Sequence, residues 1–347
     1  MTNPKRLGLG IVGAGMGAKP HALALQALTA EIDVRGVYRR NAAELQTFCD
    51  AYGFPTAASY EALLADPEIQ AILVLTPPNA REDIVAAAAQ AGKHVLLEKP
   101  VERTIAAAER IVASCAEAGV TLGVIFQHRF RAASKALAAS IAADAFGPLR
   151  AVHLTVPWWR PQTGYYDQKG RGTLAQDGGG VLITQAIHSL DLMLSLCGPI
   201  TEVTAMAVTT GLHQMETEDF VSAGLLFANG AVGALVATTA NYPGGPEMLV
   251  LNFDRASATL TAGALTISWM DGRIEEIGEP GEGGGGADPM AFPFAWHKAQ
   301  IADFAEAIRA GRQPLSTGVS ALRVHRLIDA LMESARQGTR IRPADES

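Results

Sequence analysis

The sequence predicts an α/β fold of two domains: a first domain with a parallel sheet over residues 1–126, and a second α/β domain with a large, mainly antiparallel open sheet over residues 127–347. Three observations lead to this prediction. A chain of 347 residues exceeds the usual size of a single core. Short apolar runs alternate with alanine-rich stretches in the first part, which is typical of βαβ units. Beyond about residue 149, longer β-rich runs joined by turns indicate antiparallel pairing.

The first domain contains five short apolar runs that we interpret as strands. They are Leu7–Val12, Val34–Tyr38, Ala71–Leu75, His94–Leu97 and Leu122–Phe126. Between them, Asn41 and Glu44 have the spacing of a capping box that begins one helix. Another helix is predicted over Thr104–Ala118, with a glycine stop at Gly119.

The second domain is dominated by β-rich runs. They are Ile200–Thr210, Phe220–Phe227, Ala231–Thr239, Met248–Phe253 and Ala256–Leu260. The glycine-rich stretch Gly278–Asp288 predicts a flexible loop that orders over a ligand. Two helices, His297–Ala310 and Thr317–Gln337, are expected to close the structure, and Ser316 or Thr317 caps the second.

Composition excludes several classes of function. The formal charge of −7 and the lack of a basic cluster argue against nucleic-acid binding and against an acidic membrane surface. The apolar run before Gly13 is too short for a signal peptide or a membrane span, so we expect a cytoplasmic protein. The three cysteines are widely spaced in apolar surroundings, which predicts buried reduced thiols and no metal site.

The segment from Gly13 to Ala18 has the G-x-G-x-x-A pattern between an apolar strand and a helix, the context that a dinucleotide fingerprint requires. Gly13 permits a tight turn, Gly15 allows the backbone to approach a pyrophosphate, and Ala18 permits close helix packing. A glycine turn without a ligand is the less favoured alternative.

Arg39 and Arg40 end the second predicted strand, about 20 residues after the fingerprint. An acidic residue there would bind the ribose hydroxyls of NAD, whereas a guanidinium can donate paired hydrogen bonds to a 2′-phosphate. The two arginines therefore favour NADP over NAD. The alternative is that they stack on the adenine of NAD or are solvated.

Lys99 follows a buried strand and precedes Pro100. Ligands of open α/β sheets bind beyond the carboxyl ends of the strands, and proline restricts the residue before it to extended conformations. We therefore expect Lys99 to face the ligand crevice in a fixed direction. A surface lysine at a strand end is the alternative.

His188 belongs to the second cluster of candidate residues. It follows the triple glycine at 178–180 on a predicted helix, and Thr184 and Asp191 share its face, so either could orient the imidazole. A buried structural histidine is the alternative. Upstream, an aromatic group with one arginine could stack on a sugar and pair with an anion, or could be interface packing. Its members are Trp158, Trp159, Arg160, Tyr165 and Tyr166.

Taken together, these motifs resemble the glucose–fructose oxidoreductase, inositol dehydrogenase and MocA (Gfo/Idh/MocA) family. The likeness covers nearly the whole chain. It rests on the fingerprint, Thr76–Asn79, Glu98–Pro100, Phe126–Phe130, Gly178–Asp191 and Ser334–Gly338. The resemblance implies a Rossmann dinucleotide-binding domain and a C-terminal domain that binds substrate and forms a homodimer or homotetramer through its sheet.

The resemblance also implies roles for individual residues. Lys99 and His188 resemble the catalytic lysine and histidine. The cofactor-binding set is Gly13, Gly15, Met16, Ala18, Arg39, Arg40, Thr76, Pro77, Asn79, Glu98, Lys99 and Gln127. The substrate-binding set is Lys99, Trp159, Arg160, Tyr165, Thr184, Gln185 and His188.

Two positions depart from the family pattern. Thr184 stands where many members have aspartate, which puts an Asp–His proton relay in doubt, and Arg81 stands where they have histidine. The stretch from Gly170 to His188 resembles the branch that acts on nucleotide-sugar uronates and other sugars.

The resulting hypothesis is an NAD(P)-dependent dehydrogenase or reductase that transfers hydride between nicotinamide and a secondary alcohol or ketone carbon of a sugar, cyclitol or related cyclic polyol. One alternative keeps the cofactor tightly bound and performs redox-assisted glycosidic elimination or epimerisation. Another is a non-catalytic dinucleotide sensor, because the family includes a transcriptional inhibitor of galactose metabolism in yeast.

Overall fold

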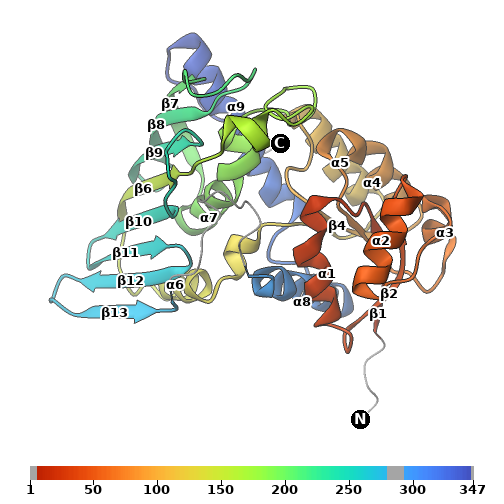
Figure 1. Ribbon diagram of the computed structural model, residues 1–347. Helices are drawn as coiled ribbons and strands as arrows, with labels where there is room; N and C mark the ends of the chain where they lie inside the picture. Colours follow the sequence, from red (N-terminus) through yellow and green to blue (C-terminus); the bar gives the residue numbers. More distant parts are fainter. Residues whose placement is uncertain (1–5, 280–292, 345–347) are drawn as a thin grey trace. The chain divides into compact units, whose positions relative to one another are not determined.

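The computed structural model describes residues 6–279 and 293–344 (Figure 1). Contacts within the chain define two compact units. The first consists of residues 1–127 and 293–322, and the second of residues 128–292 and 323–347. Most of the predicted glycine-rich loop, Gly278–Asp288, lies outside the described residues.

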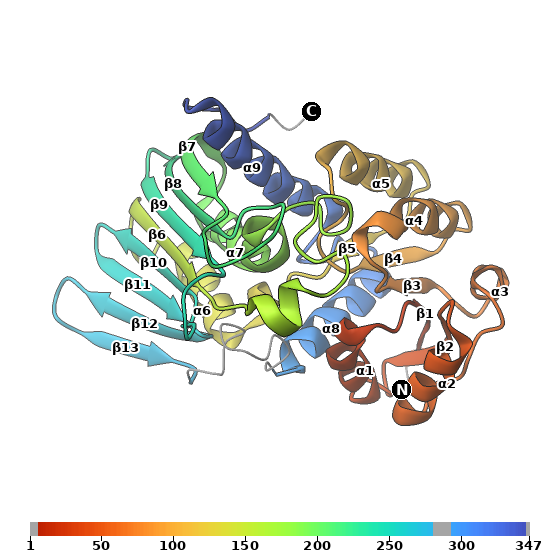
Figure 2. The same ribbon diagram turned by 45° about the horizontal axis from the view of Figure 1, so that its top comes forward.

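The first unit contains a five-stranded parallel sheet in the order β2-β1-β3-β4-β5 (Figure 2). The strands are β1 Leu7–Val12, β2 Ile32–Tyr38, β3 Ala71–Val74, β4 His94–Leu97 and β5 Leu122–Val124. The chain order reverses between β1 and β3, and ligands of open α/β sheets bind at the carboxyl ends of the strands at such a switch point. The five predicted strands are confirmed, with shifts of one or two residues at their ends.

The helices of the first unit follow these strands. They are α1 Lys19–Gln26, α2 Ala42–Tyr52, α3 Tyr60–Ala65, α4 Arg81–Gln90, α5 Ile105–Glu117 and α8 Ala295–Ala310, with short 3-10 turns at Met16–Ala18 and Pro78–Ala80. The predicted capping box is confirmed, because the amide of Glu44 donates to Asn41 over 3.2 Å and Asn41 donates back to the Glu44 carboxylate over 3.0 Å. The side chain of Thr104 caps α5. Figure 2 shows α8 beside α1, so a late segment of the chain completes the first unit.

The second unit contains an eight-stranded sheet in the order β13-β12-β11-β10-β6-β9-β8-β7, in which β6 and β9 are parallel and the other neighbours are antiparallel (Figure 1). The strands are β6 Leu149–Pro157, β7 Ile200–Val208, β8 Phe220–Phe227, β9 Val232–Thr238, β10 Met248–Phe253, β11 Ala256–Thr261, β12 Ala264–Trp269 and β13 Ile274–Ile277. The prediction of a mainly antiparallel sheet is confirmed, although β6, β12 and β13 were not identified as strands in the sequence.

Helices pack on one face of this sheet. Both α6, Ala132–Ala142, and α7, Ile187–Cys197, contact its strands. The other face carries exposed apolar side chains, including Met206, Val232 and Val236. Helix α9, Gly318–Gln337, begins at the capping residue Thr317, whose hydroxyl accepts from the amide of Ser320 over 3.1 Å.

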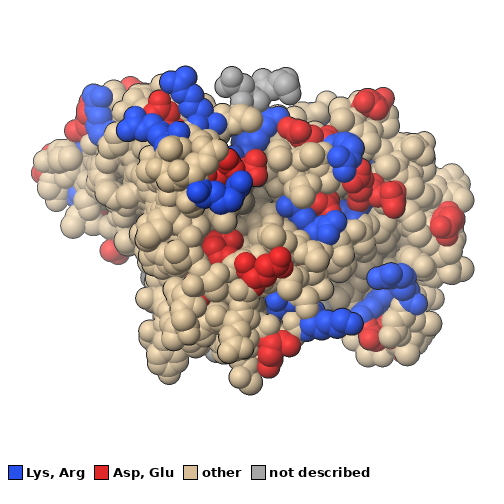
Figure 3. Space-filling view, turned by 90° about the horizontal axis from the view of Figure 1, so that it is seen from above, with Lys and Arg blue, Asp and Glu red and all other residues tan. Residues whose placement is uncertain are grey.

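The surface carries mixed charge. On the face shown in Figure 3, basic and acidic side chains are interspersed over the described residues. No helix in the described part of the chain is long and apolar enough to cross a membrane. The three cysteines are buried free thiols.

Candidate active site

The glycine turn after β1 leaves space for a ligand. Gly13 has a φ of +96°, and a Cβ there would lie 2.9 Å from the backbone of Leu75 and Thr76, so only glycine fits. At Gly15 a Cβ would meet no atom within 4 Å, which means that the turn is open on that side. Met16 and the buried Ala18 form the 3-10 turn that leads into α1. A helix start preceded by an open glycine turn is suited to bind a phosphate group.

Polar atoms at the other strand ends also fit a nucleotide. The hydroxyl of Thr76, after β3, is buried without a hydrogen-bond partner in the described structure, and so is the side-chain oxygen of Gln127, after β5. Pro77 and Asn79 are exposed at the turn before α4. Buried polar atoms are rarely left unsatisfied in folded proteins. These two atoms, with the glycine turn, therefore fit a bound dinucleotide.

Arg39 lies at the glycine turn and is already engaged. Its guanidinium donates to the Ala14 carbonyl over 2.6 Å and forms an ion pair with Glu44, in the first turn of α2. Arg40 is exposed. A 2′-phosphate near Arg39 would therefore also meet the carboxylate of Glu44.

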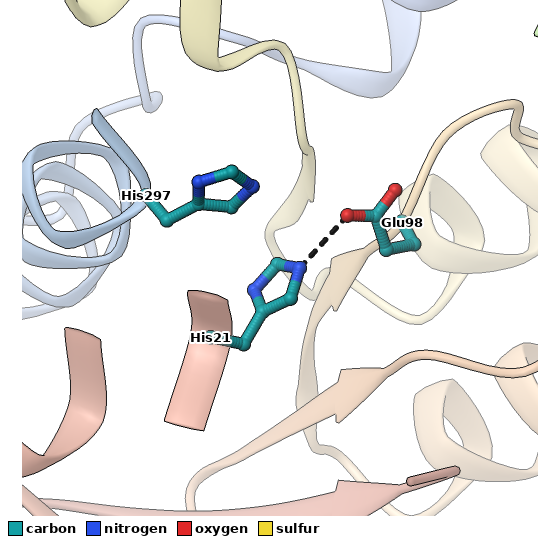
Figure 4. A group of neighbouring side chains, drawn as sticks. All are labelled: His21, Glu98 and His297. Atoms are coloured by element: carbon teal, nitrogen blue, oxygen red, sulfur yellow. Dashed lines mark hydrogen bonds and ion pairs between the residues drawn. The ribbon is translucent and has the colours of Figure 1, made fainter. Parts of the chain in front are cut away.

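Lys99 directly follows Glu98 beyond the carboxyl end of β4, and both residues are partly buried. The Glu98 carboxylate accepts from the Lys99 amide over 2.8 Å, and its other oxygen lies 2.8 Å from Nε2 of His21, in α1 (Figure 4). His297, from α8, packs edge-on against the His21 ring at 4.7 Å between centroids. This cluster connects the predicted catalytic segment to two helices of the same unit.

The electrostatics of the cluster are set by burial and hydrogen bonding. Burial opposes ionisation of Glu98, but the hydrogen bond from His21 and the nearby positive charge of Lys99 outweigh it and lower the pKa of Glu98 to about 2. Burial is the main reason that the pKa of His297 falls to about 3, and His21 acts in the same direction. At neutral pH, Glu98 is anionic and His297 is neutral.

His21, Glu98 and His297 are also residue types that bind zinc. One ligand atom from each lies within 4.8 Å of the others (Figure 4). However, the two oxygens of Glu98 already accept hydrogen bonds from His21 and the Lys99 amide. We therefore interpret the cluster as a hydrogen-bonded network. No sequence motif pointed to His21 or His297, although His21 stands out as a polar residue in the apolar helix of the fingerprint.

His188 lies in the first turn of α7 in the second unit and is buried. Its ring packs against that of His128 at 5.1 Å between centroids. The hydroxyl of Thr184 donates to the Gly180 carbonyl over 2.6 Å. Asp191 binds Arg129 through two hydrogen bonds of 2.6 and 2.5 Å. Asp191 and Thr184, the two residues expected to orient His188, thus have these other partners.

The glycine segment before α7 is held by Glu218, which was not among the predicted site residues. The buried carboxylate of Glu218 accepts from the amides of Gly180 and Leu182 over 2.9 and 3.2 Å. A Cβ at Gly180 would lie 1.8 Å from the Glu218 carbonyl, so the backbones approach too closely for any side chain. Nothing in the sequence near residue 218 indicated this contact, because it joins segments far apart in the chain.

The aromatic group of the second unit surrounds a buried arginine. Arg160 is only 2% exposed, and its guanidinium lies 5.2 Å from the ring of Trp158 and 5.7 Å from that of Tyr165. Tyr165 accepts from the side-chain amide of Gln185 over 2.9 Å, which connects this group to the segment before α7. Trp159 is partly exposed and packs edge-on against Tyr242. A second guanidinium, that of the partly exposed Arg171, lies 5.1 Å from the centre of the Tyr165 ring. Arg171 was not among the predicted substrate residues.

Comparison with known proteins agrees with this description. Residues 7–126 match the family model described as an oxidoreductase family with an NAD-binding Rossmann fold, and residues 134–265 match the GFO/IDH/MocA C-terminal domain. A curated relative, "D-xylose 1-dehydrogenase (NADP(+)) 2" from Haloferax volcanii, is 29% identical, with 96% of this chain and 98% of the relative covered. The levoglucosan dehydrogenase of Pseudarthrobacter phenanthrenivorans is 26% identical, with 95% and 96% covered.

A solved structure shows the same fold. The WlbA dehydrogenase from Bordetella pertussis, in complex with NADH and UDP-GlcNAcA, has a TM-score of 0.83 and 27% identity, with 99% of this chain and 100% of that chain covered. The two family models together cover most of the chain. The protein therefore belongs to the Gfo/Idh/MocA family of oxidoreductases.

Proposed function

We propose that the protein is an NAD(P)-dependent oxidoreductase that transfers hydride between nicotinamide and a secondary alcohol or ketone carbon of a sugar, cyclitol or related cyclic polyol. The observation that carries the proposal is the position of Lys99 beyond the carboxyl end of β4, in the unit whose glycine turn fits a dinucleotide. The substrate class is supported by two relatives that are named for xylose and levoglucosan, and by a similar structure that was solved in complex with UDP-GlcNAcA.

In this mechanism the chain supplies binding and proton transfer. Hydride acceptance or donation is the chemistry that a nicotinamide cofactor supplies when bound. The glycine turn and the start of α1 would hold the phosphates of the dinucleotide. The buried side-chain oxygens of Thr76 and Gln127 would form hydrogen bonds with its polar groups. Lys99 Nζ and the imidazole of His188 are the groups proposed to carry the hydroxyl proton.

Three finer assignments belong to the same proposal. NADP is the preferred cofactor, because Arg39 and Arg40 follow β2, where a guanidinium could donate paired hydrogen bonds to a 2′-phosphate. Trp159, Arg160, Tyr165, Thr184 and Gln185 shape the substrate side of the second unit. A homodimer or homotetramer forms through the exposed face of the eight-stranded sheet.

A dehydrogenase screen over aldoses, cyclitols and anhydrosugars with both cofactors tests the reaction. We expect NAD(P)H formation with at least one polyol. Lys99→Met and His188→Ala should each lower kcat by at least ~10²-fold, with cofactor affinity within a few-fold, because each removes an acid–base group. Unchanged kcat in both variants, or a protein that binds cofactor without turnover on any polyol, would contradict the proposal and favour a sensor.

A further inference from the structure

Arg81, the first residue of α4, is a buried cation with an unusual set of partners. Arg81 is only 3% exposed, and its guanidinium donates to three backbone carbonyls. Nε donates to the Thr76 carbonyl over 2.9 Å, and Nη1 donates to the carbonyls of Glu98 and Pro100. These carbonyls belong to the segments that follow β3 and β4.

Two of these three contacts flank the predicted catalytic lysine in the chain. The Glu98 carbonyl belongs to the peptide bond that precedes Lys99, and the Pro100 carbonyl lies one residue after it. The Lys99 amide is itself held by the Glu98 carboxylate, which His21 fixes from α1. The backbone on both sides of Lys99 is therefore tied to the cofactor segment at Thr76 through a single side chain.

Arg81 stays protonated, and therefore positively charged, at neutral pH. Burial lowers the pKa of Arg81 to about 10, and the negative charges of Glu98 and Glu102 oppose this change. A guanidinium presents several donors in a fixed plane, so it can hold several carbonyls in a defined arrangement. Neither lysine nor histidine can reproduce all three contacts.

The opposite end of β4 provides an internal comparison. Lys93, which precedes β4, is 8% exposed and donates to the carbonyls of Asp66 and Ile69, each over 2.8 Å. Lys93 and Arg81 are both buried cations that bind backbone carbonyls beside the same strand. Only Arg81 does so at the carboxyl end, where ligands bind.

We propose that Arg81 is a positioning residue that sets the placement of Lys99 relative to the cofactor segment at Thr76, and thereby the rate of hydride transfer. The proposal rests on the proposed function, in which Lys99 carries the proton. Misplacing a catalytic group by about 1 Å can cost about 10² in rate. Loss of Arg81 should therefore act on the chemical step more than on binding.

The test compares Arg81→Met with Lys93→Met in the full-length protein, with the most active polyol and the preferred cofactor. Both variants lose a buried cation, so both should have a lower Tm. For Arg81→Met we expect kcat to fall by ~10²-fold, with a larger primary deuterium isotope effect and a cofactor Kd within a few-fold. For Lys93→Met we expect kcat within about two-fold of the wild type. Arg81→Lys keeps the buried charge and part of the contacts, and should restore kcat to an intermediate value.

Two results would overturn the proposal. One is a kcat for Arg81→Met that falls no further than that of Lys93→Met at equal loss of Tm. The other is wild-type kcat and isotope effect in Arg81→Lys, which would show that charge alone suffices and would remain measurable if Arg81→Met does not fold. Wild-type activity in Lys99→Met would instead remove Lys99 from the proposed mechanism, on which this inference rests.

Discussion

The ion pair between Arg39 and Glu44 changes the cofactor preference that Arg39 alone would indicate. From the sequence, Arg39 indicates a 2′-phosphate site and Glu44 indicates a helix cap. In the structure Glu44 also forms an ion pair with Arg39, next to the glycine turn. A carboxylate at this position repels a phosphate and can accept from ribose hydroxyls, so it reduces the preference that the arginine alone would give. Cofactor preference therefore depends on which partner holds Arg39.

We predict that Glu44→Gln strengthens NADP binding relative to NAD by ~3- to 10-fold, because it removes the carboxylate that competes for Arg39, while glutamine preserves the capping box. Arg39→Asp should shift the preference toward NAD. Fluorescence titration with both reduced cofactors measures the ratio. Glu61→Gln, an exposed acid in the first turn of α3, controls for the change in net charge. Tighter binding of NAD than of NADP by the wild type would contradict the proposed preference.

At the scale of elements, the two sheets differ in how clearly the sequence predicts them. Strands β1, β3 and β4 are buried on both faces and therefore read as continuous apolar runs, which is why their limits were nearly correct. Strand β6 was not identified because the exposed Arg150 and His153 interrupt its apolar residues. Strand β13 is short and polar, so its assignment depends on pairing with β12.

The exposed face of the eight-stranded sheet carries a row of aligned side chains across five strands. Register places Met206, Ser222, Val236, Thr155 and Met248 side by side on β7, β8, β9, β6 and β10. Met206 is 53% exposed. Three of these five side chains are apolar, and exposed apolar residues aligned across a sheet are typical of an interaction surface.

We predict that Val236→Glu weakens self-association by at least ~10²-fold, because burying a carboxylate in an apolar interface costs several kcal/mol. Light scattering coupled to gel filtration should show the mass fall to that of the monomer. Val319→Glu places the same charge on an exposed position of α9 and should leave the mass unchanged. Equal masses for the wild type and Val236→Glu would mean that this face is not the interface.

At the scale of the whole molecule, the sequence predicts the last two helices of the chain but not which unit each of them completes. Helix α8, which contains His297, was predicted nearly as observed. Its apolar face alone does not specify α1 as the neighbour. The network of His21, Glu98 and His297 therefore follows from the return of α8 to the first unit, which depends on tertiary packing.

This network predicts that the first unit loses stability in mild acid. The pKa of His297 is about 3 in the folded chain because of burial, against about 6.5 when unfolded. Below pH ~6.5 the unfolded chain therefore binds a proton at this histidine, whereas the folded chain does not. The contribution of neutral His297 to the free energy of unfolding is present above that pH and declines as the pH falls toward 3. Glu98, with a folded pKa of about 2, adds a further loss as the pH falls below its unfolded value of about 4.3.

From His297 alone, the free energy of unfolding should fall by about 2 kcal/mol between pH 7.5 and 5. His297→Gln removes the ionisable group and should flatten the pH dependence over this interval, even if it lowers stability at pH 7.5 through lost packing. Urea unfolding of the wild type and the variant at pH 7.5, 6.5 and 5, followed by fluorescence and by circular dichroism, measures the difference. Parallel curves for the two proteins would mean that His297 binds its proton equally well in the folded and unfolded chains, and that burial does not hold it neutral.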